Sequence, residues 1–217
     1  MKKLMILISA TILVVSLVAS ANSATFVAGL WFDDNAFADK IFYPYVGSDH
    51  TNYVTSVGGS QSEVVTDADL STYLYCNTVG SPGVFMQIDF LDNKLINGPG
   101  PDLALFELGT NDRFDVMIGT TYKTFNTTYT GYRVGIDHRN VNVNAALIDL
   151  SEWNLFSGAV IGSVTVRLDL RTPPYNTVPT LAVVGALNST PVPIVPSSIL
   201  LLSGAGGLIA VHRKRNT

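Results

Sequence analysis

Apolar and polar residues alternate along several short segments in the middle of this 217-residue chain. In residues 84–90, Met86, Ile88 and Phe90 share one parity, and the polar side chains between them take the other. Residues 163–170 alternate in the same way over their whole length. Because successive side chains of a strand point to opposite faces, this period of two predicts β-strands with one buried face.

Other segments carry apolar runs of strand length. Residues 102–108 and 114–118 are joined by the turn-rich link 109–112, a pattern that predicts two consecutive strands. Residues 180–187 are apolar almost throughout, as in a strand that is covered on both faces. These apolar runs and the turn-rich link between two of them are typical of a protein built from β-sheets.

Short strands at regular spacing, with Gly, Pro and Asn between them, predict an all-β domain over residues 25–189. We expect this domain to be an antiparallel β-sandwich of two sheets around one core. No long amphipathic helical pattern lies in that range. At most, residues 67–75 or 150–154 are expected to form a helical turn.

The N-terminus has the pattern of a signal peptide. Lys2-Lys3 precedes an apolar run at residues 4–18, and Ala19-Ser20-Ala21 fits the small-x-small rule for cleavage. Ala24 offers a second cleavage site. We therefore predict that residues 1–24 are a signal peptide removed by signal peptidase, so that the domain is exported.

The C-terminal segment, residues 190–217, predicts a membrane anchor. Three prolines between residues 190 and 196 favour an extended tether. Residues 192–211 contain no charged side chain, and this length suits a transmembrane helix. The basic cluster 212–215 predicts a cytoplasmic C-terminus. The alternative is a buried C-terminal helix of a soluble domain, although core helices seldom lack a polar face over such a length.

Charge and cysteine content agree with an exported domain. The formal charge of the chain is −4, and removing the five basic side chains of the two terminal segments leaves −9. An acidic domain without a basic stripe argues against nucleic acid as a partner. Cys76 is the only cysteine, so no intramolecular disulfide can form, and we expect a buried thiol.

The tail also carries the elements of a sorting signal: a proline motif with small residues, a Leu- and Gly-rich span, and terminal basic residues. These elements include Pro193, Pro196, Ser197, Ser198, Gly204, Gly207, Arg213, Lys214 and Arg215. This layout resembles the C-terminal sorting signal of PEP-CTERM proteins, which an exosortase recognises and cleaves. No Glu stands between the prolines, and their spacing is one residue longer than usual, so the tail is similar to Glu-lacking variants of the signal.

The resemblance implies partners and a location. They are an exosortase-like sorting protease, a membrane that holds the export intermediate through the C-terminal helix, and a final place at the cell surface or extracellular matrix of a Gram-negative-type bacterium. A second resemblance lies in residues 98–107, which look like a "G-x-G-x-D-L-x-V-F-E" element of many exported PEP-CTERM domains. Residues 90–94, 146–150 and 184–188 resemble other parts of those domains. This second resemblance implies a jelly-roll domain of the galactose-binding type, without an established activity.

Asp102 and Glu107 are the two acidic residues singled out in this segment as ligand or structural candidates. Asp102 follows a Gly-Pro-Gly-Pro turn, where a carboxylate can accept backbone N–H groups, and we favour this capping role. Glu107 follows an apolar run in which a carboxylate needs a partner. We expect a structural ion pair of Glu107 with Arg113 or Lys94.

Metal and catalytic signatures are weak. Asp33-Asp34-Asn35 and Asp39 offer oxygen ligands that suit structural calcium, but their spacing matches no EF-hand, and an exposed acidic loop is the favoured interpretation. We therefore assign no metal ligand and expect no cofactor beyond this candidate calcium. Three histidines, one of them in the tail, form no convincing zinc set, and no Gly-x-Ser-x-Gly occurs. Carboxylate pairs for glycoside hydrolysis cannot be recognised from sequence, because their separation is spatial.

Tyrosines indicate another route to function, because sugar rings stack on aromatic side chains whose polar ends add specificity. The candidates are Tyr43, Tyr45, Tyr73, Tyr75, Tyr122, Tyr129, Tyr132 and Tyr175. Most of them individually are expected to be cross-strand pairs of a β-rich domain. We therefore expect a non-catalytic cell-surface or matrix protein, with carbohydrate or exopolysaccharide as candidate ligand. The alternative is a secreted polysaccharide-active enzyme on the same scaffold.

Overall fold

A computed structural model describes residues 24–33, 35–43, 53–56, 60–76, 85–168 and 177–191. The expected sorting segment from residue 192 onward, and the expected signal peptide before Ala24, lie outside these residues. Within the described part of the chain, no helix has the length and apolar character needed to cross a membrane.

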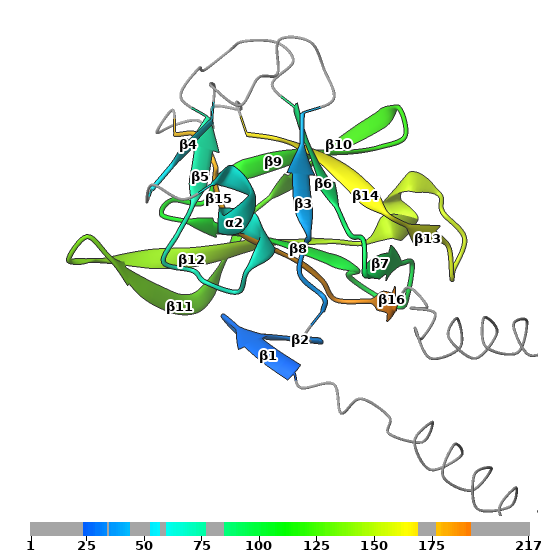
Figure 1. The fold of residues 1–217 in the computed structure, drawn as a ribbon, viewed down its shortest axis with the longest axis horizontal. Helices are drawn as coiled ribbons and strands as arrows, with labels where there is room; N and C mark the ends of the chain where they lie inside the picture. Colours follow the sequence, from blue (N-terminus) through cyan, green and yellow to red (C-terminus); the bar gives the residue numbers. More distant parts are fainter. Residues whose placement is uncertain are drawn as a thin grey trace, which may run out of the picture.

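The described residues form an all-β protein in which neighbouring strands pair in antiparallel fashion (Figure 1). One sheet has the order β10 (Thr121–Asn126), β9 (Arg113–Ile118), β14 (Ser163–Arg167), β6 (Phe85–Asp89), β3 (Lys40–Phe42). A second has the order β11 (Thr128–Ile136), β12 (Arg139–Ile148), β8 (Leu103–Leu108), β15 (Thr180–Ala186), β5 (Leu74–Cys76), β4 (Tyr53–Thr55). Two small sheets complete the fold: β1 (Ala24–Val27) with β2 (Leu30–Asp33), and β13 (Val160–Ile161), β7 (Asn93–Ile96), β16 (Ser189–Pro191).

Both large sheets contribute to one hydrophobic core. Met86 and Ile88 of β6 are fully buried while the residues between them are partly exposed, so the predicted alternation is confirmed. In β14, Val164 and Val166 enter the same core, as predicted. Cys76 is also buried there, as expected.

Strands β8 and β15 lie in the middle of the six-stranded sheet and are buried almost throughout. One face of each meets the core, and the other, outer face is covered as well. The β1–β2 hairpin places Phe32 on this outer face, with its ring 6.0 Å from that of Phe106 in β8. The helix α2 (Gln61–Thr66) lies against β15. This double cover confirms the expectation that residues 180–187 form a strand buried on both faces.

The helical turns are partly where the sequence predicted them. Leu150–Trp153 forms a 3₁₀ helix, as expected, capped by the Asp149 carboxylate. The helix expected within residues 67–75 instead lies one turn earlier, at α2. Ser60 and Glu63 form a reciprocal capping box that begins α2. The Asp67 side chain then accepts a hydrogen bond from the backbone N–H of Asp69, which favours a turn over continuation of the helix.

Phe32 attaches the β1–β2 hairpin to the six-stranded sheet, where its ring lies against Gly185 of β15. A Cβ atom on Gly185 would come within 2.6 Å of the Phe32 ring. Segment 36–38 adds backbone hydrogen bonds: Ala38 N–H donates to the carbonyl of Val184, and Ala186 N–H donates to that of Ala36. The packing of the hairpin therefore requires glycine, which has no side chain, at position 185.

We expect Gly185→Ala to destabilise the protein by about 1–3 kcal/mol, because the new methyl group must displace Phe32 from a packed site. Gly135→Ala, at a glycine of β11 with open space around it, is the matched control and should change stability little. Chemical denaturation of both variants measures the difference. Equal stability of the two variants would contradict the proposed contact.

Candidate functional site

Asp102 is a fully buried carboxylate that holds three segments together. Its Oδ1 accepts hydrogen bonds from Gly98 N–H and from Asn188 Nδ2, both at 2.8 Å. Its Oδ2 accepts one from Leu150 N–H, also at 2.8 Å. The expected capping of the Gly98–Pro101 turn is therefore present, and the same carboxylate also fixes the start of the 3₁₀ helix and the end of β15.

We expect Asp102→Ala to cost about 3 kcal/mol of stability, because two backbone N–H groups and one amide lose a charged acceptor in a buried place. Asp149→Ala is the control, since Asp149 caps a single N–H of the 3₁₀ helix near the surface. It should cost about 1 kcal/mol. Urea unfolding of both variants provides the measurement, and an Asp102→Ala loss no larger than that of Asp149→Ala would contradict this role.

Glu107 does not form the expected ion pair with Arg113 or Lys94, and that prediction is wrong. The Glu107 side chain is fully buried, and its Oε2 accepts from Thr127 Oγ1 at 2.5 Å and from Asp112 N–H at 3.1 Å. Asp112 N–H, at the end of the link 109–112, and the Thr127 hydroxyl are neutral donors. They occupy the position beside the carboxyl group where a cation was expected.

Burial raises the pKa of Glu107 to about 8, an effect only partly offset by the hydrogen bonds from Thr127 and Asp112 N–H. The carboxyl group is therefore mostly protonated at neutral pH. Its Oε1 and the Oδ1 of Asn144, the residue directly opposite on β12, are buried and without a hydrogen-bond partner among the described residues. A proton on Glu107 matches this environment, because a lone buried carboxylate would be costly.

This pKa predicts a pH dependence of stability. Between about pH 4.5 and pH 8 the unfolded chain has released the Glu107 proton while the folded protein keeps it, so stability falls as pH rises. The slope is at most about 1.4 kcal/mol per pH unit and disappears above pH 8. In Glu107→Gln, which cannot titrate, this component should be absent. Unfolding free energies of both proteins from pH 4 to pH 9 measure it, and identical profiles would contradict a raised pKa.

The residues considered for calcium do not converge in the described structure. Asp33 is exposed at the end of β2, while Asp39 Oδ2 accepts from Leu91 N–H at 2.5 Å. Burial and then the neighbouring Asp39 raise the pKa of the Asp92 carboxyl group. Asp34 lies outside the described residues. Among those described, no group of three or more His, Cys, Asp or Glu side chains is placed to hold a metal ion.

The tyrosine candidates separate into different environments. Tyr73 and Tyr75 form a ring pair with centroids 6.3 Å apart, but both lie on the same segment at β5, so this pair is not the cross-strand pair that was expected. Tyr122, Tyr129 and Tyr132 are exposed on β10 and β11. Tyr45 and Tyr175 lie outside the described residues. Of the exposed tyrosines, Tyr132 belongs to a cluster of aromatic rings, and Tyr129 lines a groove beside it.

The cluster begins on the β1–β2 hairpin. Phe26 and Trp31 are directly paired across the two strands, and their ring centroids lie 4.9 Å apart. A two-residue turn of Ala28 and Gly29, both with positive φ, joins the strands in the conformation that suits a hairpin. Trp31 is 65 % exposed, which is unusual because tryptophan side chains are highly buried on average.

Tyr132 completes the cluster from the edge strand β11, with its ring 5.8 Å from Phe26. Between Tyr129 and Arg133 the pairing of β11 with β12 is interrupted by a bulge. Gly131 within the bulge has a φ of 91°, a conformation that favours glycine. Because bulges re-aim side chains, this one turns Tyr132 toward the hairpin. We call Phe26, Trp31 and Tyr132 the aromatic shelf.

A groove of about 460 Å³ lies beside the shelf, between the hairpin and the strands β11 and β12. Its described lining consists of Ala28, Gly29, Leu30, Asn126, Thr128, Tyr129, Thr130, Ala145 and Leu147. Shelf and groove meet at Gly29, where a Cβ would lie only 3.3 Å from the Tyr132 ring. The volume is that of an ordinary small-ligand site, and the lining combines apolar surface with amide and hydroxyl groups.

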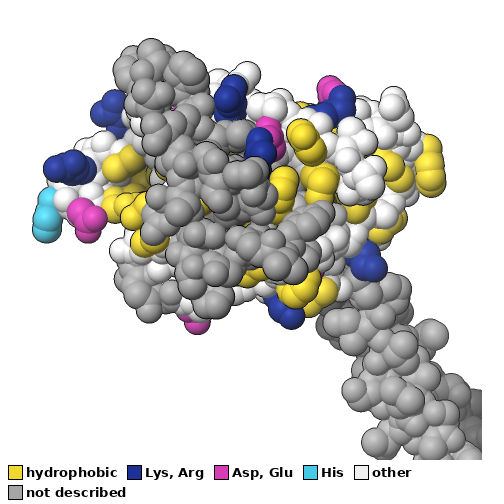
Figure 2. Space-filling view, turned by 90° about the horizontal axis from the view of Figure 1, so that it is seen from above, with side chains coloured by type: hydrophobic (Ala, Val, Ile, Leu, Met, Phe, Trp, Pro, Cys, Tyr) yellow, Lys and Arg dark blue, Asp and Glu magenta, His cyan; other side chains and the backbone are white. Residues whose placement is uncertain are grey.

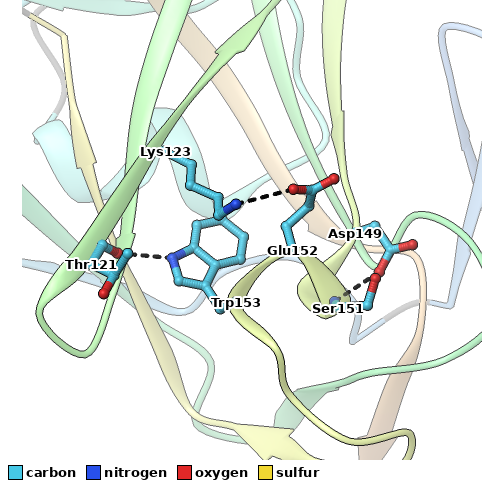
Figure 3. A network of polar contacts seen from close by, with 6 residues as sticks. All are labelled: Thr121, Lys123, Asp149, Ser151, Glu152 and Trp153. Atoms are coloured by element: carbon cyan, nitrogen blue, oxygen red, sulfur yellow. Dashed lines mark hydrogen bonds and ion pairs between the residues drawn. The ribbon is translucent and has the colours of Figure 1, made fainter.

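The strand that leads into the groove is held at its other end by the 3₁₀ helix (Figure 3). Trp153 Nε1 donates to the carbonyl of Thr121 at 2.8 Å, and Lys123 Nζ lies 3.2 Å from Glu152 Oε2. The Trp153 ring also packs on Phe125, with centroids 5.6 Å apart. These contacts fix β10, which ends at Asn126 in the groove.

The sequence pattern indicated Tyr129 and Tyr132 as candidates but not Phe26 and Trp31. Their signal was weak, because the hairpin turn is Ala28-Gly29 rather than the Asn-Gly or Asp-Gly that marks such turns. Two short apolar runs around a glycine were the available hint. Comparison of the chain with protein-family models, with curated proteins and with solved structures finds no match. What the site binds therefore has to follow from its own residues.

Proposed function

We propose that this chain is an exported, non-catalytic protein of the cell surface or extracellular matrix that binds carbohydrate at the aromatic shelf and groove. The observation that carries the binding role is the exposed aromatic shelf beside a groove lined by hydroxyl and amide groups. Exposed rings offer faces to the C–H surface of a sugar, and Asn126 and Thr128 offer donors and acceptors to its hydroxyl groups.

The strand pairing supports a jelly-roll architecture. Strand β5 pairs with β15, β6 with β14, and β8 with β12, so that pairs nest inside one another along the chain. The chain also alternates between the two large sheets along β5, β6, β8 and β9 and again along β12, β14 and β15, as happens in a double-sheet jelly roll, while β9–β10 and β11–β12 are hairpins within one sheet. We include in this proposal that the jelly roll is of the galactose-binding-like type.

The groove lining supports binding without hydrolysis. Glycoside hydrolysis ordinarily uses two carboxylates on either side of the sugar bond. The described lining contains no Asp or Glu, and Glu107 is fully buried in the core. On the described part of the face shown in Figure 2, basic and acidic side chains are dispersed among one another.

The export part of the proposal rests on the two ends of the chain. The signal peptide, the transmembrane helix and the proline-led sorting signal at residues 193–215 would deliver the domain outside the cytoplasm and hold it until an exosortase-like protease cuts. A carbohydrate-binding domain is a consistent cargo, because its ligand would be exopolysaccharide at the destination.

We expect Gly131→Ala to abolish or strongly weaken carbohydrate binding, because alanine disfavours the φ of the bulge that aims Tyr132. Gly119→Ala is the matched control: this glycine of the β9–β10 turn also has positive φ and open space around it. A glycan array with both folded variants provides the measurement. Equal binding by the two variants, or no binding by the unaltered protein, would contradict the proposed site.

Deletion of Pro193–Thr217 tests the sorting role. The truncated protein should be exported and released as a folded domain, because the tether and apolar helix that retain it are gone. Fractionation of cells expressing the full and truncated chains, followed by a thermal melt of the released protein, measures this. A truncated protein that stays with the membrane, or that has lost its cooperative melt, would show that the tail serves the fold instead.

A further inference from the structure

The groove has a lining without charge. Its described residues are four apolar side chains, one glycine, two threonines, one asparagine and one tyrosine. Acidic sugars carry carboxylate or sulfate groups, and proteins recognise such anions with Arg, Lys or clustered backbone N–H groups. A ligand with fixed negative charge would lose its hydration here without gaining a cation.

The basic side chains nearest in sequence each contact a neighbouring polar group. Arg133, next to Tyr132, directs its Nε to the Asn142 Oδ1 at 2.9 Å. Lys123, on the strand that ends in the groove, pairs with Glu152. The chain as a whole is also acidic, with a formal charge of −4. Long-range electrostatics therefore oppose the approach of a polyanion.

The shelf and the groove together are larger than one sugar ring requires. Two ring-to-ring steps of 4.9 Å and 5.8 Å lead across Phe26 from Trp31 to Tyr132, and the groove continues from there at Gly29. The rings lie on the open surface, so a ligand that fills the groove can extend over them. This layout suits several consecutive units of a chain more than a single monosaccharide.

We propose that the shelf and groove bind a stretch of an uncharged polysaccharide, with sugar faces stacked on the shelf and sugar hydroxyl groups hydrogen-bonded to Asn126 and Thr128. This inference rests on the proposed carbohydrate-binding function and narrows it to neutral polymers. Hydroxyl and amide groups exchange donors and acceptors with sugar hydroxyls without any ionic contribution, so binding is insensitive to salt.

The test measures binding of the purified full-length chain, in a detergent without a sugar headgroup, to neutral and acidic polymers. Dextran, galactan, mannan and xylan are the neutral probes, and alginate and polygalacturonate are the acidic ones. We expect binding to at least one neutral polymer, unchanged between low and physiological salt, and roughly tenfold weaker or no binding to the acidic ones.

Three variants assign the binding to the site. Trp31→Ala should weaken neutral binding roughly tenfold, because it removes the most exposed ring. Tyr122→Ala is its control, since that tyrosine is 57 % exposed but lies outside the groove lining. Thr128→Lys, which places a cation on an exposed position of the lining, should weaken neutral binding and create salt-sensitive binding to alginate.

Each outcome has a distinct meaning. Salt-sensitive binding to acidic polymers by the unaltered protein would overturn this inference and leave the proposed function standing. Binding to no polymer would overturn the proposed function and, with it, this inference. Neutral binding that is the same in Trp31→Ala as in Tyr122→Ala would show that the polymer binds elsewhere on the protein, which also overturns the assignment.

Discussion

One buried carboxylate determines how the ends of three segments meet. Asp102 stands at the start of β8 and accepts hydrogen bonds from Gly98, Leu150 and Asn188, which come from the preceding turn, the 3₁₀ helix and the end of β15. Its own backbone N–H donates to the carbonyl of Ile148, and its carbonyl accepts from Leu187. The register of β8 between β12 and β15 is thus fixed at one end by a single residue. A charged group can be buried here because every strong interaction it needs is supplied by donors already in place.

That register supports the proposed binding surface on the outer face of the six-stranded sheet. With β8 and β15 fixed, Phe106 and Gly185 form the place where Phe32 packs, and Phe32 holds the β1–β2 hairpin. The hairpin in turn carries Trp31 and forms one wall of the groove. This surface is therefore supported from beneath by the buried packing of Phe32, while the aromatic ring of Trp31 remains exposed. Rigid support beneath a few exposed rings lowers the entropy that binding must otherwise overcome.

Much of the fold follows from local sequence patterns, and the site follows from them only in part. The period of two predicted β6 and β14, and the turn before Asp102 predicted its capping role, because each signal lies within a few residues. The Leu150 and Asn188 donors could not be predicted, since they are brought in from distant segments by the fold. The predicted ion pair of Glu107 was wrong because the prediction considered only charge. The sequence did not show that the link 109–112 brings Asp112 N–H to the carboxyl group. Trp31 was not predicted as a site residue, because the residues around it in the sequence do not distinguish an exposed aromatic ring from a buried one.

Fluorescence of Trp31 tests the central claim most directly, because this side chain lies on the shelf and is mostly exposed. The chain has two tryptophans, so Trp153→Phe leaves Trp31 as the sole reporter. Titration with neutral oligosaccharides, combined with quenching by acrylamide, reports both binding and coverage of the ring. The account predicts a saturable change in emission and protection of Trp31 from the quencher at saturating sugar. A sugar that binds by calorimetry yet leaves the emission and quenching of Trp31 unchanged would contradict it.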